Sequence, residues 1–371
     1  MILLALLSLP ASADAIRLAS VYHDDQPHGQ VESQDPSLHV VSWPFCPSYG
    51  KSCAELAWVE VGVSVDAYVA RRNGPHAAAS ELTLTSVADM QPLARALEAF
   101  FQEQGITSDA VKVGYAHGLV QSLDYHLDSE TGWTEYPKYA IESLVDEQGD
   151  CDDGAIWTAS LLTALGYSPF YVRWRNKDDS GGHLSTALPI GTGDLAQVER
   201  PSDSPLITWE GQDFLHVDGT GSIGGCGRGC GKLGWNGWKA KGLSLQTVVA
   251  VADPNLDTLL PLSAWDNGNQ HFPGRQTQDW REEDPDRIRE RLQDWDWEAR
   301  TKSRLKDLGR EDPELWLKKR QPNPVGDGTW MLLSGAMSFG LLMALALTWR
   351  ARQRRLAEAE RLAAERRKQQ F

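Results

Sequence analysis

The sequence predicts an α+β fold, in which a run of helices is followed by an antiparallel sheet. Apolar residues recur at helical spacing in four segments, namely residues 92–105, 108–125, 137–149 and 151–165. Three later segments alternate with the period of a strand, namely residues 169–175, 183–190 and 214–219. Because these short strands are separated by polar, glycine-rich loops, an antiparallel sheet is expected rather than a parallel one.

Each element has a local reason in the sequence. Residues 35–72 contain strand-like stretches, and valines alternate with other side chains in residues 56–69. From Pro92 the period becomes helical, and Ser108 with Asp109 caps the second helix. We therefore expect a small β-containing N-terminal region before the helices.

The fourth helix carries the clearest end signals. Asp150 is a good N-cap residue, and Gly166 fits the position just after the last helical turn. Further along the chain, residues 286–308 form an amphipathic pattern. Its apolar side chains at helical spacing are Ile288, Leu292, Trp295 and Ala299. The pattern is compatible with a stalk and with a lid that packs back on the domain.

Composition and charge limit the classes of function. The chain has 371 residues, of which 41% are hydrophobic, so one or two globular domains are expected. It carries 36 Lys and Arg against 51 Asp and Glu, a formal net charge of −15. Such a chain would repel a phosphate backbone, so we expect no nucleic-acid partner.

The N-terminus resembles a secretory signal peptide. Residues 2–9 are an apolar run, and small residues between Ala11 and Ala15 supply a cleavage pattern. The positively charged segment that usually precedes such a run is missing here. An apolar strand or helix is the alternative interpretation of residues 1–13.

A second apolar segment predicts a membrane anchor. Residues 330–349 carry no charge, begin and end with Trp, and match one bilayer core of about 30 Å as a helix. Basic residues are more frequent after this segment than before it. We therefore expect a single-pass membrane protein with residues 14–329 outside the cytoplasmic membrane and residues 350–371 as a basic cytoplasmic tail.

These signals divide the chain into consecutive regions. The predicted regions are a signal peptide (1–13), a β-rich region (14–90), a central domain that includes Cys151 (91–252), a charged helical or linker segment (253–329), a transmembrane helix (330–349) and a tail (350–371).

Five cysteines outside the cytoplasm would leave one over after pairing. The simplest pairs are Cys46 with Cys53 and Cys226 with Cys230, which leave Cys151 outside any disulfide. A metal site at Cys226 and Cys230 is the alternative, but nothing nearby supplies two further ligands convincingly.

Cys151 stands in a favourable position for a nucleophile. It opens a helix directly after Asp150, and a helix N-terminus stabilises the thiolate, which is the reactive form. Asp152 and Asp153 follow at once and would repel a thiolate. A positive group is therefore expected close by.

His183 and Asp218 are the candidate partners. His183 opens a strand 32 residues after Cys151, and Asp218 ends a strand 35 residues later. An imidazolium would lower the pKa of the thiol and protonate a leaving amine, while a carboxylate would orient the ring. Alternatively, the cysteine only packs, the histidine lies at the surface and the aspartate begins a turn. His216 competes for a polar role, although we expect it to be a neighbouring sheet residue.

The residues around these three positions resemble transglutaminase-like cysteine enzymes of the papain-related superfamily. The resemblance covers residues 108–222 and is most specific at GDCDD and the helix after it, then at GGHLSTALPI and FLHVDGTGS. It implies a nucleophile helix packed on an antiparallel sheet, with Cys151, His183 and Asp218 as the triad. Gln121 matches the place where related enzymes stabilise the oxyanion, with a solvent-facing glutamine as the alternative.

Other features have simpler explanations. The chain departs from the family at Leu184, where an aromatic residue is common, and in the loop of residues 219–241. The acids of DCDD are interpreted as partners of the helix dipole rather than as a metal cluster, and no metal or cofactor is expected. Trp235 and Trp238 are interpreted as loop anchors, with stacking on a substrate as the alternative.

The sequence thus favours an extracytoplasmic thiol acyl-transfer enzyme. Its expected substrate is a carboxamide of a protein or peptide in the cell envelope, and its expected intermediate is a thioester. Hydrolysis is favoured over cross-linking because water is abundant and nothing marks an amine site. The alternative is a non-catalytic envelope scaffold or binding module on the same fold.

Overall fold

A computed structural model of the chain describes its central part. The described residues are 15–23, 35, 37–47, 56–76, 78–126, 136–176, 182–200, 204–220, 233–234, 243–260, 284–293 and 302. The described residues all belong to one compact unit, which lies within residues 1–316. The predicted signal peptide, transmembrane helix and cytoplasmic tail lie outside the described residues.

A small antiparallel sheet opens the fold, as the strand-like pattern predicted. Its strands are β1 (Ile16–His23), β2 (Leu38–Phe45) and β3 (Ala57–Ser64), in the order β1-β3-β2. Strand β3 lies in the middle and is buried along its whole length. The predicted strand does not continue to residue 69, because Ser64 caps a helix, α1 (Val65–Arg72), by accepting a hydrogen bond from the main-chain nitrogen of Ala67.

Four further helices follow and build the centre of the unit. They are α2 (Ala79–Glu103), α3 (Asp109–Val120), α5 (Ala140–Asp146) and α6 (Cys151–Ala164). Helix α2 starts well before the predicted start at Pro92, which lies inside it. The predicted start of the catalytic domain at residue 91 therefore falls within α2, and this helix contacts both β1 and α6.

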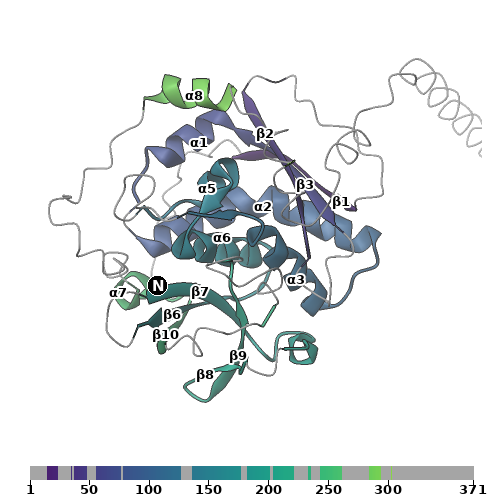
Figure 1. The fold of residues 1–371 in the computed structure, drawn as a ribbon, viewed down its shortest axis with the longest axis vertical. Helices are drawn as coiled ribbons and strands as arrows, with labels where there is room; N and C mark the ends of the chain where they lie inside the picture. The colour runs from purple at the N-terminus through teal and green to yellow at the C-terminus, as the bar shows by residue number, and fades with distance from the viewer. Residues whose placement is uncertain are drawn as a thin grey trace, which may run out of the picture. The chain divides into compact units, whose positions relative to one another are not determined.

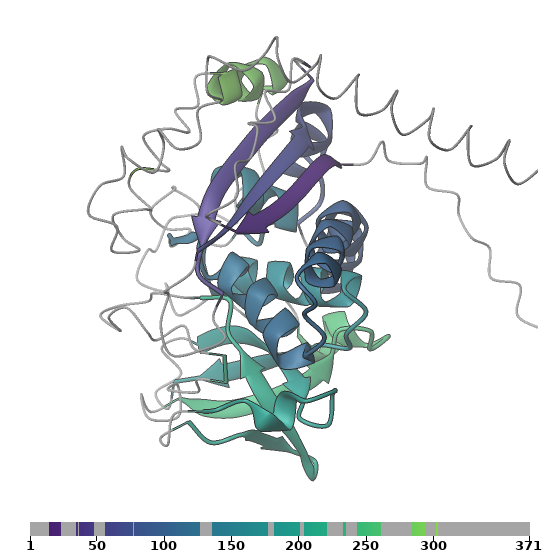
Figure 2. The same cartoon turned by 90° about the vertical axis from the view of Figure 1, so that its right-hand side faces the viewer.

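The predicted antiparallel sheet is present, with two strands more than expected. Its order is β10-β6-β7-β9-β8, and every neighbouring pair is antiparallel. The strands are β6 (Phe170–Arg175), β7 (Gly182–Pro189), β8 (Ile207–Trp209), β9 (Gln212–Val217) and β10 (Ser244–Ala250). Figures 1 and 2 show helices α2 and α6 between this sheet and the small N-terminal sheet.

Helix α6 packs on the five-stranded sheet, mainly against β7. The hydroxyl of Thr186 on β7 donates to the main-chain oxygen of Ala155 on α6 at 3.3 Å. The main hydrophobic core lies between the helices and the inner faces of both sheets. A smaller cluster, including Trp174 and Phe214, lies on the other face of the five-stranded sheet. The helix that Cys151 opens is therefore in direct contact with the strand that carries His183.

Two very short strands lead the chain to the start of α6. Strand β4 (Asp124–Tyr125) follows α3 and pairs in parallel with β5 (Gln148–Gly149), so that Tyr125 lies opposite Gly149. Gly166, just after α6, has a φ of 87°, as expected for a helix end.

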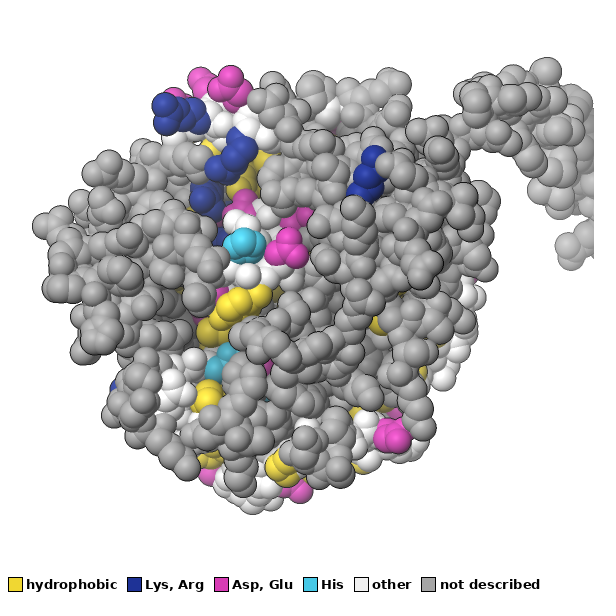
Figure 3. Space-filling view, viewed as in Figure 1, with side chains coloured by type: hydrophobic (Ala, Val, Ile, Leu, Met, Phe, Trp, Pro, Cys, Tyr) yellow, Lys and Arg dark blue, Asp and Glu magenta, His cyan; other side chains and the backbone are white. Residues whose placement is uncertain are grey.

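The described helices of the charged segment after the sheet pack back on the domain. Helix α7 (Leu256–Leu259) contacts α2, and α8 (Pro285–Gln293) contacts α1. Ile288 and Leu292 of α8 are buried in the main core, and the guanidinium of Arg289 lies 3.0 Å from a carboxylate oxygen of Asp66 on α1. Charged side chains of both signs cover the outer side of α8 (Figure 3). Of the two alternatives, residues 285–293 follow the one in which the helix packs back.

Among the described residues, no helix combines the length and the apolar character that crossing a bilayer requires.

Candidate functional site

The predicted nucleophile lies where the sequence placed it. Cys151 is the first residue of α6, follows the N-cap Asp150, and is 6% exposed. Its sulfur is not half of a disulfide. The unsatisfied amide groups of a first helical turn favour a negative charge there, so this position stabilises a thiolate.

Asp153 holds the turn that delivers Cys151. One of its carboxylate oxygens accepts from the main-chain nitrogen of Lys138 at 2.7 Å, and the other accepts from that of Asp150 at 3.2 Å. Gly149 packs so closely that a Cβ added there would lie 2.6 Å from the Cβ of Asp153. Any larger side chain at this position would push the turn away from the helix.

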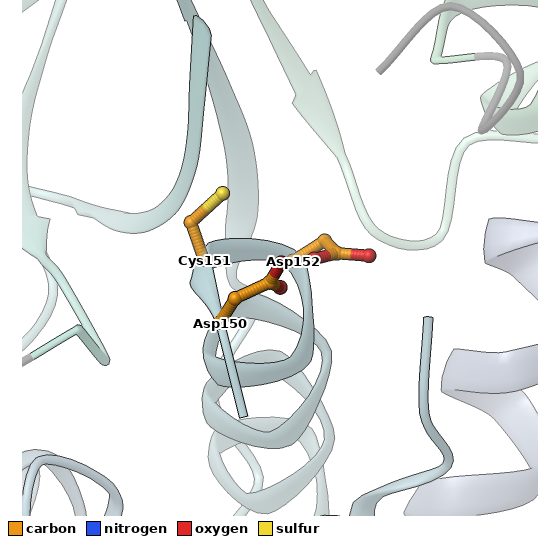
Figure 4. A group of neighbouring side chains, drawn as sticks. All are labelled: Asp150, Cys151 and Asp152. Atoms are coloured by element: carbon orange, nitrogen blue, oxygen red, sulfur yellow. The ribbon is translucent and has the colours of Figure 1, made fainter. Parts of the chain in front are cut away.

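The acids on either side of Cys151 lie close together. In Figure 4 the sulfur points away from the carboxyl groups of Asp150 and Asp152, which lie next to each other. The ligand atoms of the three side chains all lie within 4.8 Å of one another. Burial, and then the neighbouring Asp152, raise the pKa of Asp150 well above its usual value. A raised pKa favours the neutral form of Asp150 over its carboxylate.

Lys138 supplies positive charge beside this turn, although the sequence did not single it out. Its ammonium lies 3.8 Å from a carboxylate oxygen of Asp153 and 3.7 Å from one of Asp146, and it donates to the main-chain oxygen of Gln148 at 3.2 Å. It thereby offsets the charge of Asp153 in the first turn of α6.

His183 and Asp218 meet from adjacent strands. Nε2 of His183, on β7, lies 3.0 Å from a carboxylate oxygen of Asp218, which directly follows β9, and both side chains are buried. Burial alone would raise the pKa of Asp218, but the charge of His183 and the hydrogen bond outweigh it and hold this pKa below its usual value. The carboxyl group is therefore ionised and can support a positive imidazole.

The segment after Asp218 lies against the first turns of α6. A Cβ added to Gly219 would lie 2.6 Å from the main-chain oxygen of Gly154. Burial raises the pKa of Tyr125, and the charges of Cys151, Asp150, Asp152 and, more weakly, Asp218 raise it further. The start of α6 and the end of β9 thus face one region of the molecule.

Asp218 is held from several sides. Its second carboxylate oxygen accepts from the main-chain nitrogen of Thr220 at 3.1 Å and from the hydroxyl of the same residue. Its main-chain oxygen accepts from Nε2 of His117 at 2.7 Å and from the amide nitrogen of Gln121 at 2.9 Å. Gln121 therefore reaches into the site instead of facing solvent. His117 was missed, although its helical spacing from Gln121 was a usable signal.

His216, the competitor for a polar role, belongs to the sheet. Its Nε2 lies 2.7 Å from the hydroxyl of Ser185, which also accepts from the indole nitrogen of Trp174 at 3.1 Å. These contacts agree with its interpretation as a neighbouring sheet residue.

Several predicted residues lie outside the described part of the chain. They are Cys53, Cys226, Cys230, Trp235 and Trp238. Cys46 is described and directly follows β2. The two disulfides and the role of the tryptophans therefore stay predictions.

Comparison with known proteins adds little. No protein-family model and no curated protein sequence matches the chain. A solved structure described as a TGase is similar with 14% identity and a TM-score of 0.25, over 47% of this chain and 44% of that one. A protein of Cytophaga hutchinsonii, assigned provisionally as a cysteine protease, is similar with 12% identity and a TM-score of 0.24, over 63% of this chain and 76% of that one.

The chain spans less than half the length of the first of these structures. Likenesses with such TM-scores assign neither a family nor an activity.

Proposed function

We propose that this protein is a thiol acyl-transfer enzyme of the transglutaminase-like type, acting on a carboxamide through Cys151, His183 and Asp218. The observation that carries the proposal is the buried contact of 3.0 Å between His183 and Asp218. The residue after Asp218, Gly219, packs against Gly154 of the helix that Cys151 opens. A nucleophile at a helix start, a histidine and an ionised carboxylate are the groups that such a reaction needs.

In the proposed reaction the thiolate of Cys151 attacks the carbonyl carbon of the carboxamide. His183 then protonates the leaving amine, and a thioester remains on the sulfur. Because Nε2 of His183 faces Asp218, proton exchange with the sulfur would run through Nδ1. Water, activated by the now neutral imidazole, hydrolyses the thioester and restores the thiol. No metal or cofactor is required for these steps.

The oxyanion formed during the attack needs hydrogen-bond donors. The amide group of Gln121 has two protons, and only one is needed for its contact with Asp218. We assign the second proton to the oxyanion, as a proposal that goes together with the triad.

The proposed substrates are proteins or peptides of the cell envelope. This follows from the predicted signal peptide and the predicted anchor at residues 330–349, which would hold the site outside the cytoplasmic membrane. Hydrolysis remains favoured over cross-linking, because no feature of the described residues marks a site for an attacking amine.

Alkylation of Cys151 by iodoacetamide tests the triad. At pH 6 the wild-type thiol should react about ten times faster than the thiol of His183→Ala, because the imidazolium keeps it ionised. Mass spectrometry of the labelled peptide identifies Cys151, and Cys151→Ser serves as the blank. Equal rates in wild type and His183→Ala would contradict the enzyme and favour the scaffold or binding module.

A further inference from the structure

The main chain of Asp218 leaves the sheet at the point where its side chain is needed. Strand β9 ends at Val217, whose pairing with Thr186 is the last of the ladder with β7, so Asp218 lies just beyond this ladder. Asp218 is only 5% exposed, and a buried carbonyl without a donor is costly. Helix α3 supplies the donors instead.

Two side chains one helical turn apart meet this carbonyl. His117 lies in the last turn of α3 and Gln121 caps its end. Nε2 of His117 donates at 2.7 Å and the amide nitrogen of Gln121 at 2.9 Å, both to the main-chain oxygen of Asp218. An α-helix places residues i and i+4 on one face, so a single rigid element makes both contacts.

We propose that His117 and Gln121 are positioning residues, which fix the main chain of Asp218 so that its carboxylate stays on His183. This inference rests on the proposed function. Under this proposal α3, a helix that carries none of the three triad residues, holds the triad in position.

The contacts of Asp218 show why its main chain matters. One carboxylate oxygen is bound to His183 and the other to Thr220, two residues further on. If the carbonyl lost its donors, the peptide would rotate toward other donors and carry the carboxylate with it. The hydrogen bond to His183 would then lengthen, and the imidazolium would lose its support.

The protonation state of His117 agrees with this role. A carbonyl oxygen only accepts, so Nε2 must carry the proton. Burial lowers the pKa of His117 to about 4, partly offset by the hydrogen bond to Asp218, and the nearby His216 lowers it further. At neutral pH the ring is therefore neutral, and it supports Asp218 without adding a charge.

The pH dependence of alkylation tests this support independently of oxyanion binding. Iodoacetamide reacts at a saturated carbon, so its reaction with Cys151 forms no oxyanion and reports the ionisation of the thiol alone. In His117→Leu and in Gln121→Leu the rate at pH 6 should fall about threefold to tenfold, and the rates should converge with wild type near pH 9. His117→Gln restores an amide donor and should recover most of the rate.

Gln102→Leu is the matched control, because Gln102 is exposed on α2. It should leave the profile unchanged. Wild-type profiles in both His117→Leu and Gln121→Leu would overturn the proposal. A wild-type profile for Gln121→Leu with a lower kcat on an amide substrate would assign Gln121 to the oxyanion alone, and would equally overturn its positioning role.

If the proposed function itself were wrong, the alkylation rates would differ from those expected when only the positioning role fails. In that case wild type itself would react no faster than His183→Ala, whatever happens on α3. Should His117→Leu fail to fold, Gln121→Leu alone decides, since Gln121 is only half-buried at a helix end.

Discussion

Three acidic residues neighbour Cys151 in the sequence, and the structure shows two features that reduce their negative charge. A thiolate beside three charged carboxylates would be strongly disfavoured. Burial and the neighbouring Asp152 raise the pKa of Asp150 and so favour its neutral form, and the ammonium of Lys138 lies 3.8 Å from Asp153. The local negative charge is thereby reduced, and the helix N-terminus can favour the thiolate of Cys151.

At the same scale, His117 makes folding stability depend on pH. Its pKa is about 4 in the folded state, because burial disfavours the charged ring, against 6.5 for an ordinary histidine. The unfolded chain therefore binds a proton more readily between these values, and stability falls as the pH drops from about 6.5 to about 4. The contribution lost is on the order of 3 kcal/mol.

His117→Gln isolates this contribution, because the amide cannot titrate. Urea unfolding at pH 7, 5.5 and 4 should show the free energy of unfolding of wild type decreasing relative to that of the variant, by about 3 kcal/mol in total. Other titrating groups affect both proteins alike and cancel in the difference. A difference that stays constant with pH would show that His117 is not buried as a neutral ring.

At the scale of elements, the contact between the end of β9 and helix α6 joins the parts of the site. A Cβ on Gly219 would lie 2.6 Å from both the main-chain oxygen of Gly154 and the hydroxyl of Thr158. Gly219→Ala must therefore push the segment that contains Asp218 away from α6. We expect a loss of stability of about 1–3 kcal/mol and slower alkylation of Cys151 at pH 6.

Gly154→Ala is the matched control on the other side of this contact. Its added Cβ would lie 3.4 Å from the nearest atom, the main-chain carbon of Gly219, which is an ordinary contact. Alanine also favours a helix interior over glycine by up to about 1 kcal/mol. This variant should keep its alkylation rate and be at least as stable as wild type. Equal behaviour of the two alanine variants would show that the contact does not control the site.

Secondary structure could be predicted where one local signal dominates. The strands that became β6, β7 and β9 follow a clear alternation, and Asp150 and Gly166 mark the ends of α6. Helix α1 was missed because its alternating valines continue those of β3, although Ser64 offered an N-cap signal. Burial against neighbouring elements decides such segments, and a single sequence does not show it.

The sequence predicted those site residues whose type and position alone suggest a chemical role. Cys151, His183 and Asp218 were chosen by residue type and by position at the ends of elements, and the structure brings His183 onto Asp218. His117 and Lys138 were missed because their roles depend on contacts with residues far away in the sequence or across a turn. Only tertiary structure joins them to the site.

For the whole molecule, the segment after the sheet is tied to the N-terminal half. Arg291 on α8 donates to the hydroxyl of Tyr68 on α1 at 3.1 Å, and that hydroxyl donates to Asp146 at 2.6 Å. Asp146 in turn lies 3.7 Å from the ammonium of Lys138. A chain of polar contacts thus runs from α8 to the residues that neighbour the first turn of α6.

The C-terminal tail differs in charge from the chain as a whole, and this difference bears on the predicted membrane topology. Residues 350–371 carry eight basic and three acidic side chains, whereas the whole chain has a net charge of −15. Basic segments stay preferentially on the cytoplasmic side of a membrane. If residues 330–349 span the bilayer, the compact unit must lie on the opposite side.

Introduced cysteines test this topology in intact cells whose outer barrier has been permeabilised. Leu84 is 66% exposed on α2, so Leu84→Cys should react with a maleimide that cannot cross membranes. Gln370→Cys, in the predicted tail, should react only after lysis. Both reporters are introduced into Cys151→Ser, and Cys151→Ser without a reporter measures the labelling of the other four native cysteines, which is subtracted. Protection of Leu84→Cys together with labelling of Gln370→Cys would reverse the orientation, and it would move the proposed substrates from the cell envelope to the cytoplasm.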